Sequence, residues 1–242
     1  MHLKYWLSQW MWAGLDWLFP PDCGGCNRAG YRWCPDCQKQ VQTIPEPVCR
    51  TCGLPITRPG QCSSCRVSVP PYAMMRSWLV FEGPICNALH KLKYRRNLAL
   101  GDALADHLAE YVYPLEWPID LVVPVPLGKE RAKERGYNQV GLVAMPLALI
   151  NHWRYSLRAL VRTRDTKSQV GLSIAERREN VSGAFVGNQA LVHGMNILLM
   201  DDVATTGATL SSCAAALMDA GAKTVYALTL ARALPHHDLN IV

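Results

Sequence analysis

Two adjacent carboxylates, Asp201 and Asp202, follow four apolar residues at 197–200 and precede a run of small residues. Carboxylates at the carboxyl end of a buried strand are suited to hold ribose hydroxyls or a hard metal ion. Unpaired backbone N–H groups at the start of a helix bind phosphate, because they and the helix dipole favour an anion. The segment therefore predicts a site for a phosphorylated sugar.

The residues after the acid pair have the composition of a phosphate-binding loop. Gly207 lets a ligand approach the backbone closely, and threonine hydroxyls add donors beside the backbone N–H groups. The alternative interpretation is an Asp-rich turn followed by a threonine that caps a helix, which is a common arrangement. The residues expected to bind the phosphate are Ala204, Thr205, Thr206, Gly207, Ala208 and Thr209.

Eight of the ten cysteines form four pairs in which two residues separate the partners. This spacing lets two thiolates point at one tetrahedral ion, and two such pairs complete a four-sulfur zinc site. The repeated short spacing disfavours disulfides and a redox motif, whereas an iron–sulfur cluster stays open as an alternative because it also takes thiolate ligands. The expected metal ligands are Cys23, Cys26, Cys34, Cys37, Cys49, Cys52, Cys62 and Cys65.

Consecutive cysteine pairs are expected to share a metal. This pairing closes two short loops, at residues 23–37 and 49–65, and loop-closure entropy favours it over an interleaved cross-brace. The segment is rich in Gly and Pro and would depend on metal to fold. Four-thiolate sites have no open position, so two structural zinc ions are expected. Cys86 and Cys213 lie in apolar helical patterns and are interpreted as small buried hydrophobes.

The order of the predicted elements is that of an α/β domain. Four apolar runs are predicted to form strands, at residues 77–81, 120–126, 197–200 and 224–230. Four further segments are predicted to form helices, at residues 84–94, 98–111, 139–150 and 209–220. Gly221 is a typical helix stop. Strand–helix–strand units with right-handed crossovers build a parallel sheet flanked by helices.

Composition shifts divide the chain into three parts. Pro70 and Pro71 mark the expected boundary before the α/β domain. The predicted parts are an amphipathic helix at residues 1–19, a cysteine-rich zinc-binding module at residues 20–69 and the α/β domain at residues 70–242.

The first 19 residues contain tryptophans at helical spacing. Their few early positive charges, polar interruptions and closing prolines support neither a secretory signal peptide nor a membrane span. A cytoplasmic protein is therefore expected, and peripheral contact with the inner membrane is the alternative use of the aromatic face.

The chain has 242 residues, of which half are hydrophobic, and a net charge of +6. It can bury a substantial core and favours an anionic partner, either a phosphorylated small molecule or nucleic acid. Five cations at residues 154–167, opposed only by Asp165, form an electrostatic footprint for the phosphates of a sugar or of a single strand. A further basic cluster lies at residues 91–96. It either contributes to binding of an anion or is simply the solvated face of an amphipathic helix.

The acid pair and its loop resemble the signature of the type I phosphoribosyltransferases. With the cysteine pairs and the segments Pro124-Val125-Pro126 and Arg135-Gly136-Tyr137-Asn138-Gln139, the chain is similar to the ComF/GntX family of bacterial competence and DNA-utilisation proteins. Leu92-Lys93-Tyr94 is also similar to an element of that family. The resemblance implies a type I phosphoribosyltransferase-like domain behind a zinc module.

The resemblance also implies a role for each candidate residue. Asp201 and Asp202 would hold the ribose of phosphoribosyl pyrophosphate as the catalytic pair, the loop would hold its 5′-phosphate, and Mg²⁺ would bridge ribose and pyrophosphate. The pyrophosphate would be held by Lys129, Arg131 and Arg135, since arginine pairs bidentately with phosphate. A flap over the site, or a nucleic-acid contact, is implied for Arg158, Arg162, Arg164, Lys167 and Arg177.

Two functions follow from the resemblance. The first is a binding protein of DNA uptake, natural transformation or nutritional use of DNA, whose pocket holds phosphoribosyl pyrophosphate or a nucleotide. Its implied partners are single-stranded DNA, a helicase-like ATPase and a recombination mediator of the competence system. The second is an active phosphoribosyltransferase of nucleobase salvage or nucleotide metabolism. The sequence has no recognisable base-selecting segment, which favours the first function.

Overall fold

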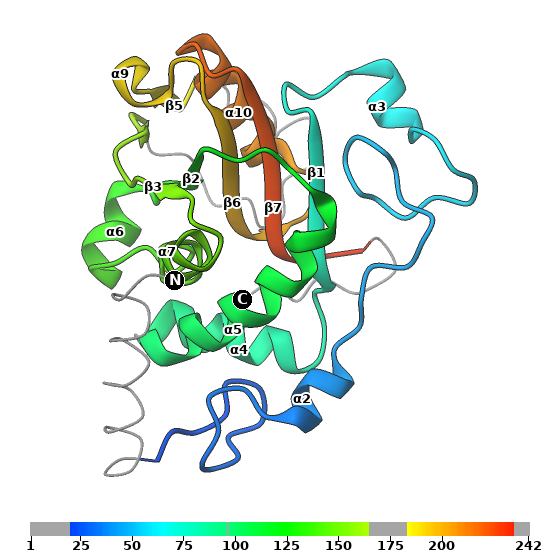
Figure 1. The fold of residues 1–242 in the computed structure, drawn as a ribbon. Coiled ribbons are helices and arrows are strands. Elements are labelled where there is room, and N and C mark those ends of the chain that lie inside the picture. Colours follow the sequence, from blue (N-terminus) through cyan, green and yellow to red (C-terminus); the bar gives the residue numbers. More distant parts are fainter. Residues whose placement is uncertain (1–19, 96, 165–182, 235–242) are drawn as a thin grey trace.

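The computed structural model describes residues 20–95, 97–164 and 183–234. These residues form a five-stranded parallel sheet flanked by helices, with a cysteine-rich segment beside it (Figure 1). The strand order is β1-β7-β6-β2-β3. The strands are β1 (Met74–Val80), β2 (Leu121–Pro124), β3 (Arg154–Tyr155), β6 (Asn196–Ala204) and β7 (Thr224–Arg232).

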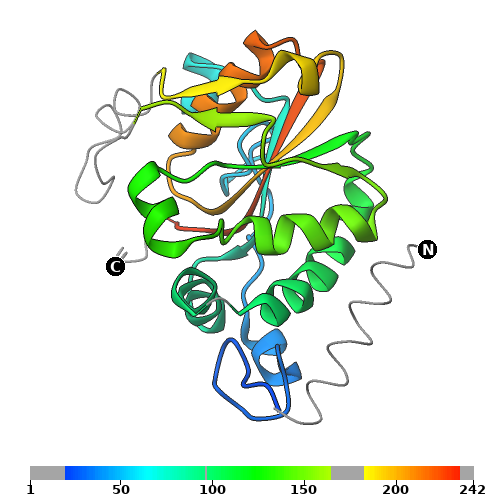
Figure 2. The ribbon, with the colours of Figure 1, turned by 90° about the vertical axis from the view of Figure 1, so that its left-hand side faces the viewer.

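Helices cover both faces of the sheet, as Figure 2 shows. The residues of β6 alternate between two cores: Leu198 and Met200 belong to the core on one face, Ile197 and Leu199 to the core on the other. This double burial explains why the strand reads as a continuous apolar run. The first face carries α4 (Pro84–Tyr94), α5 (Leu98–Val112) and α7 (Gly141–Ile150), and the second carries α10 (Ala208–Asp219).

The parallel α/β architecture confirms the predicted fold class, and the helix at residues 84–94 has the predicted bounds. The central strand is longer than predicted, because β6 stays paired with β7 from Asn196 to Ala204. Asp201 and Asp202 therefore lie within the last residues of the paired strand and not after its end. Residues 129–135, which contain the three cations expected to hold pyrophosphate, form the short helix α6 (Lys129–Arg135), which ends at Gly136 with φ 68°.

A two-stranded antiparallel ribbon packs on α10. It pairs β4 (Leu160–Arg162) with β5 (Phe185–Gly187). A Cβ added to Gly187 would lie 2.6 Å from the carbonyl oxygen of Ala216, so the ribbon is in direct contact with the helix. Two short elements remain among the described residues: the helix α9 (Gln189–Val192) and the 3-10 turn η1 (Tyr113–Leu115).

The cysteine-rich segment forms two small modules. The first contains α2 (Pro35–Gln40) and packs below α4 and α5, where a Cβ added to Gly24 would clash with Leu100 (Figure 1). The second contains α3 (Ser63–Val67) and lies beside β1. Both modules contact the α/β domain. The buried cysteines of the first module belong to the hydrophobic core of the adjoining helices.

The helix predicted at residues 1–19 lies outside the described residues. Among those that are described, no helix is both long and apolar enough to cross a membrane.

Candidate functional site

The acid pair lies at the carboxyl end of β6, where the sheet is still paired on the β7 side. The carboxylate of Asp201 accepts from the backbone N–H of Asp202 at 2.9 Å, and that of Asp202 accepts from the N–H of Val203 at 2.8 Å. Each side chain is thus fixed by the backbone of its successor. The second carboxyl oxygen of Asp202 is left for side-chain donors.

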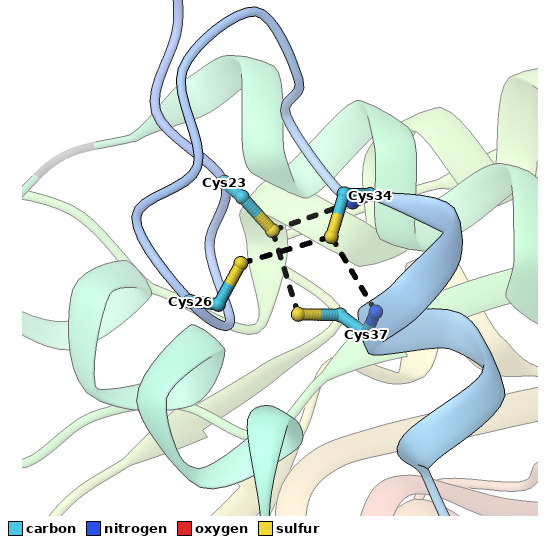
Figure 3. A group of neighbouring side chains, drawn as sticks. All are labelled: Cys23, Cys26, Cys34 and Cys37. Carbon is cyan, nitrogen blue, oxygen red and sulfur yellow. Dashed lines mark hydrogen bonds between the residues drawn. The ribbon is translucent and has the colours of Figure 1, made fainter.

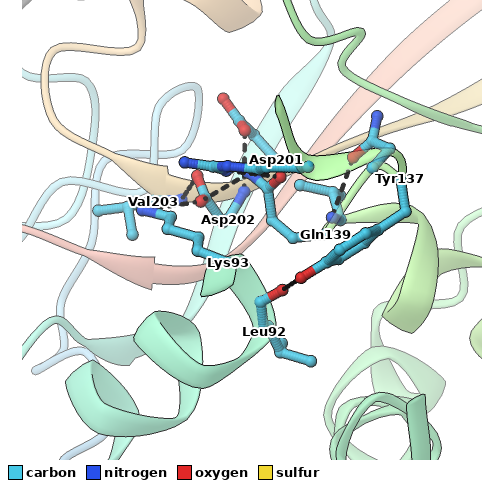
Figure 4. A network of polar contacts seen from close by, with 10 residues as sticks. Leu92, Lys93, Tyr137, Gln139, Asp201, Asp202 and Val203 are labelled. Carbon is cyan, nitrogen blue, oxygen red and sulfur yellow. Dashed lines mark hydrogen bonds and ion pairs between the residues drawn. The ribbon is translucent and has the colours of Figure 1, made fainter. Parts of the chain in front are cut away.

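Two side chains from other elements contact Oδ2 of Asp202. The ammonium of Lys93, at the end of α4, lies 3.1 Å away, and the amide nitrogen of Gln139 donates to the same oxygen at 3.2 Å. The Lys93 and Asp202 side chains are only 21% and 14% exposed. The second acid is therefore held in a half-buried ion pair between three segments that are far apart in sequence (Figure 4).

The end of α4 is tied to the segment after α6 by further contacts. The hydroxyl of Tyr137 donates to the carbonyl of Leu92 at 2.7 Å. Arg135 donates to the amide oxygen of Gln139 at 2.9 Å, and its guanidinium lies 5.2 Å from the centre of the Tyr94 ring. In Figure 4, Tyr137 faces the end of α4 and Gln139 faces the acid pair. The segments noted for their family resemblance thus form one network.

The two acids have opposite pKa shifts. Burial raises the pKa of Asp201 well above its usual range, and the neighbouring charge of Asp202 adds to the rise. Burial acts on Asp202 in the same direction, but the charge of Lys93 and the hydrogen bonds of Lys93 and Gln139 outweigh it, so the pKa of Asp202 is lowered. Asp202 is therefore the first of the pair to ionise, and Asp201 retains its proton to higher pH.

The predicted phosphate loop joins β6 to α10. Gly207 has φ 78°, a left-handed conformation that favours glycine, and immediately precedes the helix. The hydroxyl of Thr206 accepts from the N–H of Ala208 at 3.3 Å. The helix begins at Ala208, one residue earlier than predicted. The loop has the predicted strand–turn–helix geometry, and its binding of a phosphate stays a prediction.

The predicted pyrophosphate residues fall into two groups. Arg135 is half-buried and reaches the acid pair through Gln139, whereas Lys129 and Arg131 lie exposed on α6. The amide of Asn138 donates to the carbonyl of Val125 at 2.9 Å, and its oxygen accepts from the N–H of Val140. Asn138 therefore shapes this segment.

The predicted flap residues are only partly described. Arg158 and Arg164 are exposed, and Arg162 on β4 stacks over the ring of Phe185 at 5.6 Å. Lys167 and Arg177 lie outside the described residues. Arg162 lies on β4, Arg158 just before it and Arg164 just after it, and none of the three belongs to the network around Asp202 that is described above.

Lys93 was not among the site residues predicted from the sequence, and neither was a contact between Gln139 and Asp202. The available signal was the Leu92-Lys93-Tyr94 element, which the basic cluster around it allowed to be read as a solvated face. The charge of Lys93 instead points at the acid pair.

The first group of four cysteines converges on one point (Figure 3). The sulfurs of Cys23 and Cys37 are 3.7 Å apart, as are those of Cys26 and Cys34. Sulfurs placed about 2.3 Å from a zinc ion in a tetrahedron are about 3.8 Å from one another, so the group fits the ion. The space between them is that of one ion, not of an iron–sulfur cluster.

The second group has the same construction. Its sulfurs also lie within 4.8 Å of one another, and those of Cys52 and Cys62 are 3.7 Å apart. Backbone N–H groups donate to sulfur in both groups, from Cys34 to Cys23 and from Cys62 to Cys49, at 3.3 Å. The consecutive pairing of the four Cys-x-x-Cys motifs is thereby confirmed.

Backbone hydrogen bonds favour the thiolate form of one cysteine in each group. Burial alone would raise the pKa of Cys23 and of Cys49, but hydrogen bonds from following residues of the same loops lower each to about 6. Burial raises the pKa of Cys37 and Cys65, and the neighbouring cysteines add to the rise. All ten cysteines lie in the described residues and none is in a disulfide; Cys213 is buried as predicted, and Cys86 is half-buried.

A comparison with known families supports the metal assignment. The family described as double zinc ribbon domain matches residues 14–66. This range contains all eight cysteines of the two groups. The cysteine-rich segment is a double zinc ribbon.

Several curated proteins are similar to most of the chain. The DNA utilization protein YhgH of Escherichia coli O6:H1 is 33% identical over 83% of this chain and 90% of its own length. Competence protein F of Haemophilus influenzae is 29% identical over 83% and 90%, respectively. Competence protein ComFC of Bacillus subtilis is 29% identical over 82% and 83%.

Solved structures match a part of the chain at low similarity. The glutamine phosphoribosylpyrophosphate amidotransferase of B. subtilis, complexed with ADP and GMP, is 22% identical over 59% of this chain and 27% of that one, with a TM-score of 0.36. An adenine phosphoribosyltransferase is 18% identical over 56% and 72%, with a TM-score of 0.36.

Proposed function

Because the chain belongs to the ComF/GntX family of competence and DNA-utilisation proteins, we propose that it acts in DNA uptake, in natural transformation or in the use of DNA as a nutrient. The relatives named for these roles match along most of their own length. The match therefore covers both the zinc ribbons and the α/β domain, and the proposal concerns the two together.

Within this role, the acid pair and the loop after it would bind phosphoribosyl pyrophosphate or the phosphate of a nucleotide. The observation that carries this proposal is the succession of Asp201, Asp202 and the Gly207 turn at one strand-to-helix junction. Carboxylates at this point suit ribose hydroxyls, and the start of α10 suits a phosphate. Arg135 would approach the pyrophosphate from the opposite segment.

The donor set also fits Mg²⁺, which prefers carboxylate and phosphate oxygens. Asp201 would hold it, because it is the acid that lacks the Lys93 contact and whose charged form is disfavoured without a cation. The ion would supply positive charge next to the ribose and the pyrophosphate. Asp202, already compensated by Lys93, would orient the ribose.

A genetic experiment tests the role in DNA uptake. A strain lacking this gene would be complemented with the unaltered gene or with Asp201→Asn combined with Asp202→Asn, and transformants would be counted. Recovery with the unaltered gene and failure with the double variant, at equal protein levels, is expected. Normal transformation in the deletion strain would contradict the proposed role.

A second candidate function is phosphoribosyl transfer. The pair of acids with opposite pKa shifts favours it, since a site for transfer must hold the ribose while positive charge develops on it. Release of pyrophosphate from phosphoribosyl pyrophosphate in the presence of individual nucleobases would establish this activity. Binding without release under any base would leave the first function.

A further inference from the structure

The second zinc ribbon, at Cys49, Cys52, Cys62 and Cys65, lies against the strand that supports the phosphate loop. The N–H of Met75 on β1 donates to the carbonyl of Thr51 at 2.7 Å. A Cβ added to Gly53 would lie 2.7 Å from the carbonyl oxygen of Met75, so the ribbon is seated directly on this strand. On its other side, the sulfur of Met75 lies 3.7 Å from the Cβ position of Gly207.

Tyr72 is a second residue that lies between the second zinc ribbon and the phosphate loop. Its side chain is 4% exposed, and its hydroxyl lies 3.6 Å from the Cβ position of Gly207. It is also hydrogen-bonded to the side chain of Ser211 on α10. Burial raises the pKa of Tyr72, and the nearby thiolates of Cys52 and Cys65 act in the same direction. A single layer of side chains thus separates the metal site from the loop.

Arg232, the last residue of β7, provides the charged contact. It is 3% exposed, and its guanidinium donates to the carbonyl of Cys52 at 2.6 Å. Its Nε has no hydrogen-bond partner among the described residues. Arg232 is paired with Ala204, and the N–H of Ala233 donates to the carbonyl of Ala204 at 2.9 Å. Arg232, which contacts the metal ligand Cys52, is therefore paired in the sheet with Ala204, where the loop begins.

A buried guanidinium needs a compensating anion. A zinc ion bound by four thiolates carries two net negative charges, and Arg232 lies against one of the ligands. The arginine and the metal site would thus stabilise each other.

The first zinc ribbon has an equivalent contact in a different place. The ammonium of Lys91 on α4 donates to the carbonyl of Cys23. The amide of Asn87 on the same helix donates to the carbonyl of Gly25 at 2.8 Å. This ribbon packs on α4 and α5, and its buried cysteines share their core rather than that of the phosphate loop. It provides a matched control within the same chain.

We propose that the second zinc ribbon positions the phosphate loop, with Arg232 as the positioning residue between the metal site and the end of β6, and that the first ribbon does not. Loss of metal from the second site would then loosen residues 204–207 and weaken phosphate binding. Only the effect on ligand affinity rests on the function proposed above, since the order of the loop can be measured without a ligand.

Two pairs of variants test the proposal. Cys65→Ser and Cys37→Ser each remove the last ligand of one site, and Arg232→Met and Lys91→Met each remove the cation at one ribbon. Hydrogen exchange of peptides covering residues 203–209 would be compared with that of peptides from α5 as an internal reference. Zinc content would be measured for each protein.

Amide exchange in the loop is expected to rise about tenfold in Cys65→Ser and in Arg232→Met, and to remain unchanged in Cys37→Ser and Lys91→Met. If Cys65→Ser or Arg232→Met fails to fold, the unaltered protein would be treated with a chelator, and loop exchange should then rise with loss of the second zinc. Equal loop exchange in both members of each pair, or loop exchange that does not change as the second zinc is lost, would overturn the proposal.

The affinity for phosphoribosyl pyrophosphate with Mg²⁺ separates this inference from the proposed function. Binding by the unaltered protein that weakens about tenfold in Arg232→Met but not in Lys91→Met supports both. A loop that loosens selectively in a protein that binds no phosphoribosyl pyrophosphate supports the inference and contradicts the ligand. Unchanged binding and unchanged exchange in Arg232→Met contradict the inference alone.

Discussion

The ammonium of Lys93, at the end of α4, lies 3.1 Å from Oδ2 of Asp202, near the end of β6. The second acid of the pair is thus compensated within the protein. Asp201, one residue before it, has no such partner among the described residues and keeps a raised pKa. We therefore propose different tasks for the two acids: Asp202 would orient a ligand and Asp201 would receive a cation.

Replacement of Lys93 by methionine should destabilise the protein at neutral pH. The half-buried carboxylate of Asp202 would lose its compensating charge, at a cost of about 1–3 kcal/mol in the free energy of unfolding. Because Lys93 lowers the pKa of Asp202 in the folded state, its contribution is present above the unfolded-state pKa of about 3.9 and is lost as the pH falls through the folded-state value. Urea unfolding at several pH values measures this difference.

Lys133→Met is the matched control for that experiment, since Lys133 is exposed on α6. It should change stability by less than about 0.5 kcal/mol at any pH. An effect of Lys93→Met that persists undiminished near about pH 3 would show that the loss comes from packing and not from the ion pair.

Binding of Mg²⁺ with phosphoribosyl pyrophosphate should release a proton. The raised pKa of Asp201 means that this group retains its proton to higher pH than an ordinary aspartate, and a bound cation would drive the proton off. The affinity should therefore increase as the pH rises through the pKa of Asp201. Calorimetry in buffers of different ionisation enthalpy counts the protons. An identical heat in every buffer, for a protein that does bind, would exclude Asp201 from the cation site.

The purified protein should contain about two zinc ions per chain, one for each group of four cysteines. Cys49→Ser should reduce the content to about one, because three thiolates bind zinc more weakly than four. Cys86→Ser is the control, since Cys86 lies outside both groups, and should leave the content unchanged. Elemental analysis that finds iron instead of zinc would contradict the assignment.

The arginines around the β4–β5 ribbon distinguish a nucleic-acid contact from a flap over the pocket. If they follow a single strand of DNA, affinity should fall with salt by about 0.7 log units per phosphate contact for each log unit of salt. Replacing Arg158, Arg162 and Arg164 together by glutamine should flatten this slope and weaken binding to all sequences alike. Fluorescence anisotropy with labelled oligonucleotides measures both.

The control for the triple change replaces Lys39, Arg58 and Arg66, which are exposed on the zinc ribbons and carry the same total charge. It should leave the slope unchanged. A slope near zero for the unaltered protein would end the DNA hypothesis, and a loss of phosphoribosyl pyrophosphate affinity in the arginine variant alone would assign these residues to a flap.

The α/β domain and the zinc ribbons could be predicted because their signals are local. The continuous apolar run at residues 197–200 is typical of a strand buried on both faces, and the two-residue spacing of the cysteines fixes two ligands to one ion. The loop at Gly207 was likewise predictable, since only a few residue types permit a left-handed turn before a helix.

The partners of Asp202 could not be predicted, because they depend on which helices the sheet brings together. Lys93 lies on a helix that packs on one face of the sheet, and its side chain reaches the edge where β6 ends, beside the contact that Tyr137 makes with the end of that helix. A lysine near a helix terminus has the same sequence pattern whether it faces solvent or an acid. For the same reason, nothing in the sequence connected Arg232 with Cys52.

Calorimetric titration of the protein with phosphoribosyl pyrophosphate and Mg²⁺ tests whether the acid pair and its loop form a phosphosugar pocket. We expect saturable binding of one ligand per chain that requires the metal ion and is weakened at least about tenfold in Asp201→Asn combined with Asp202→Asn, while the thermal unfolding of the variant stays cooperative. Absence of binding, or equal affinity in the unaltered protein and the double variant, would contradict this pocket.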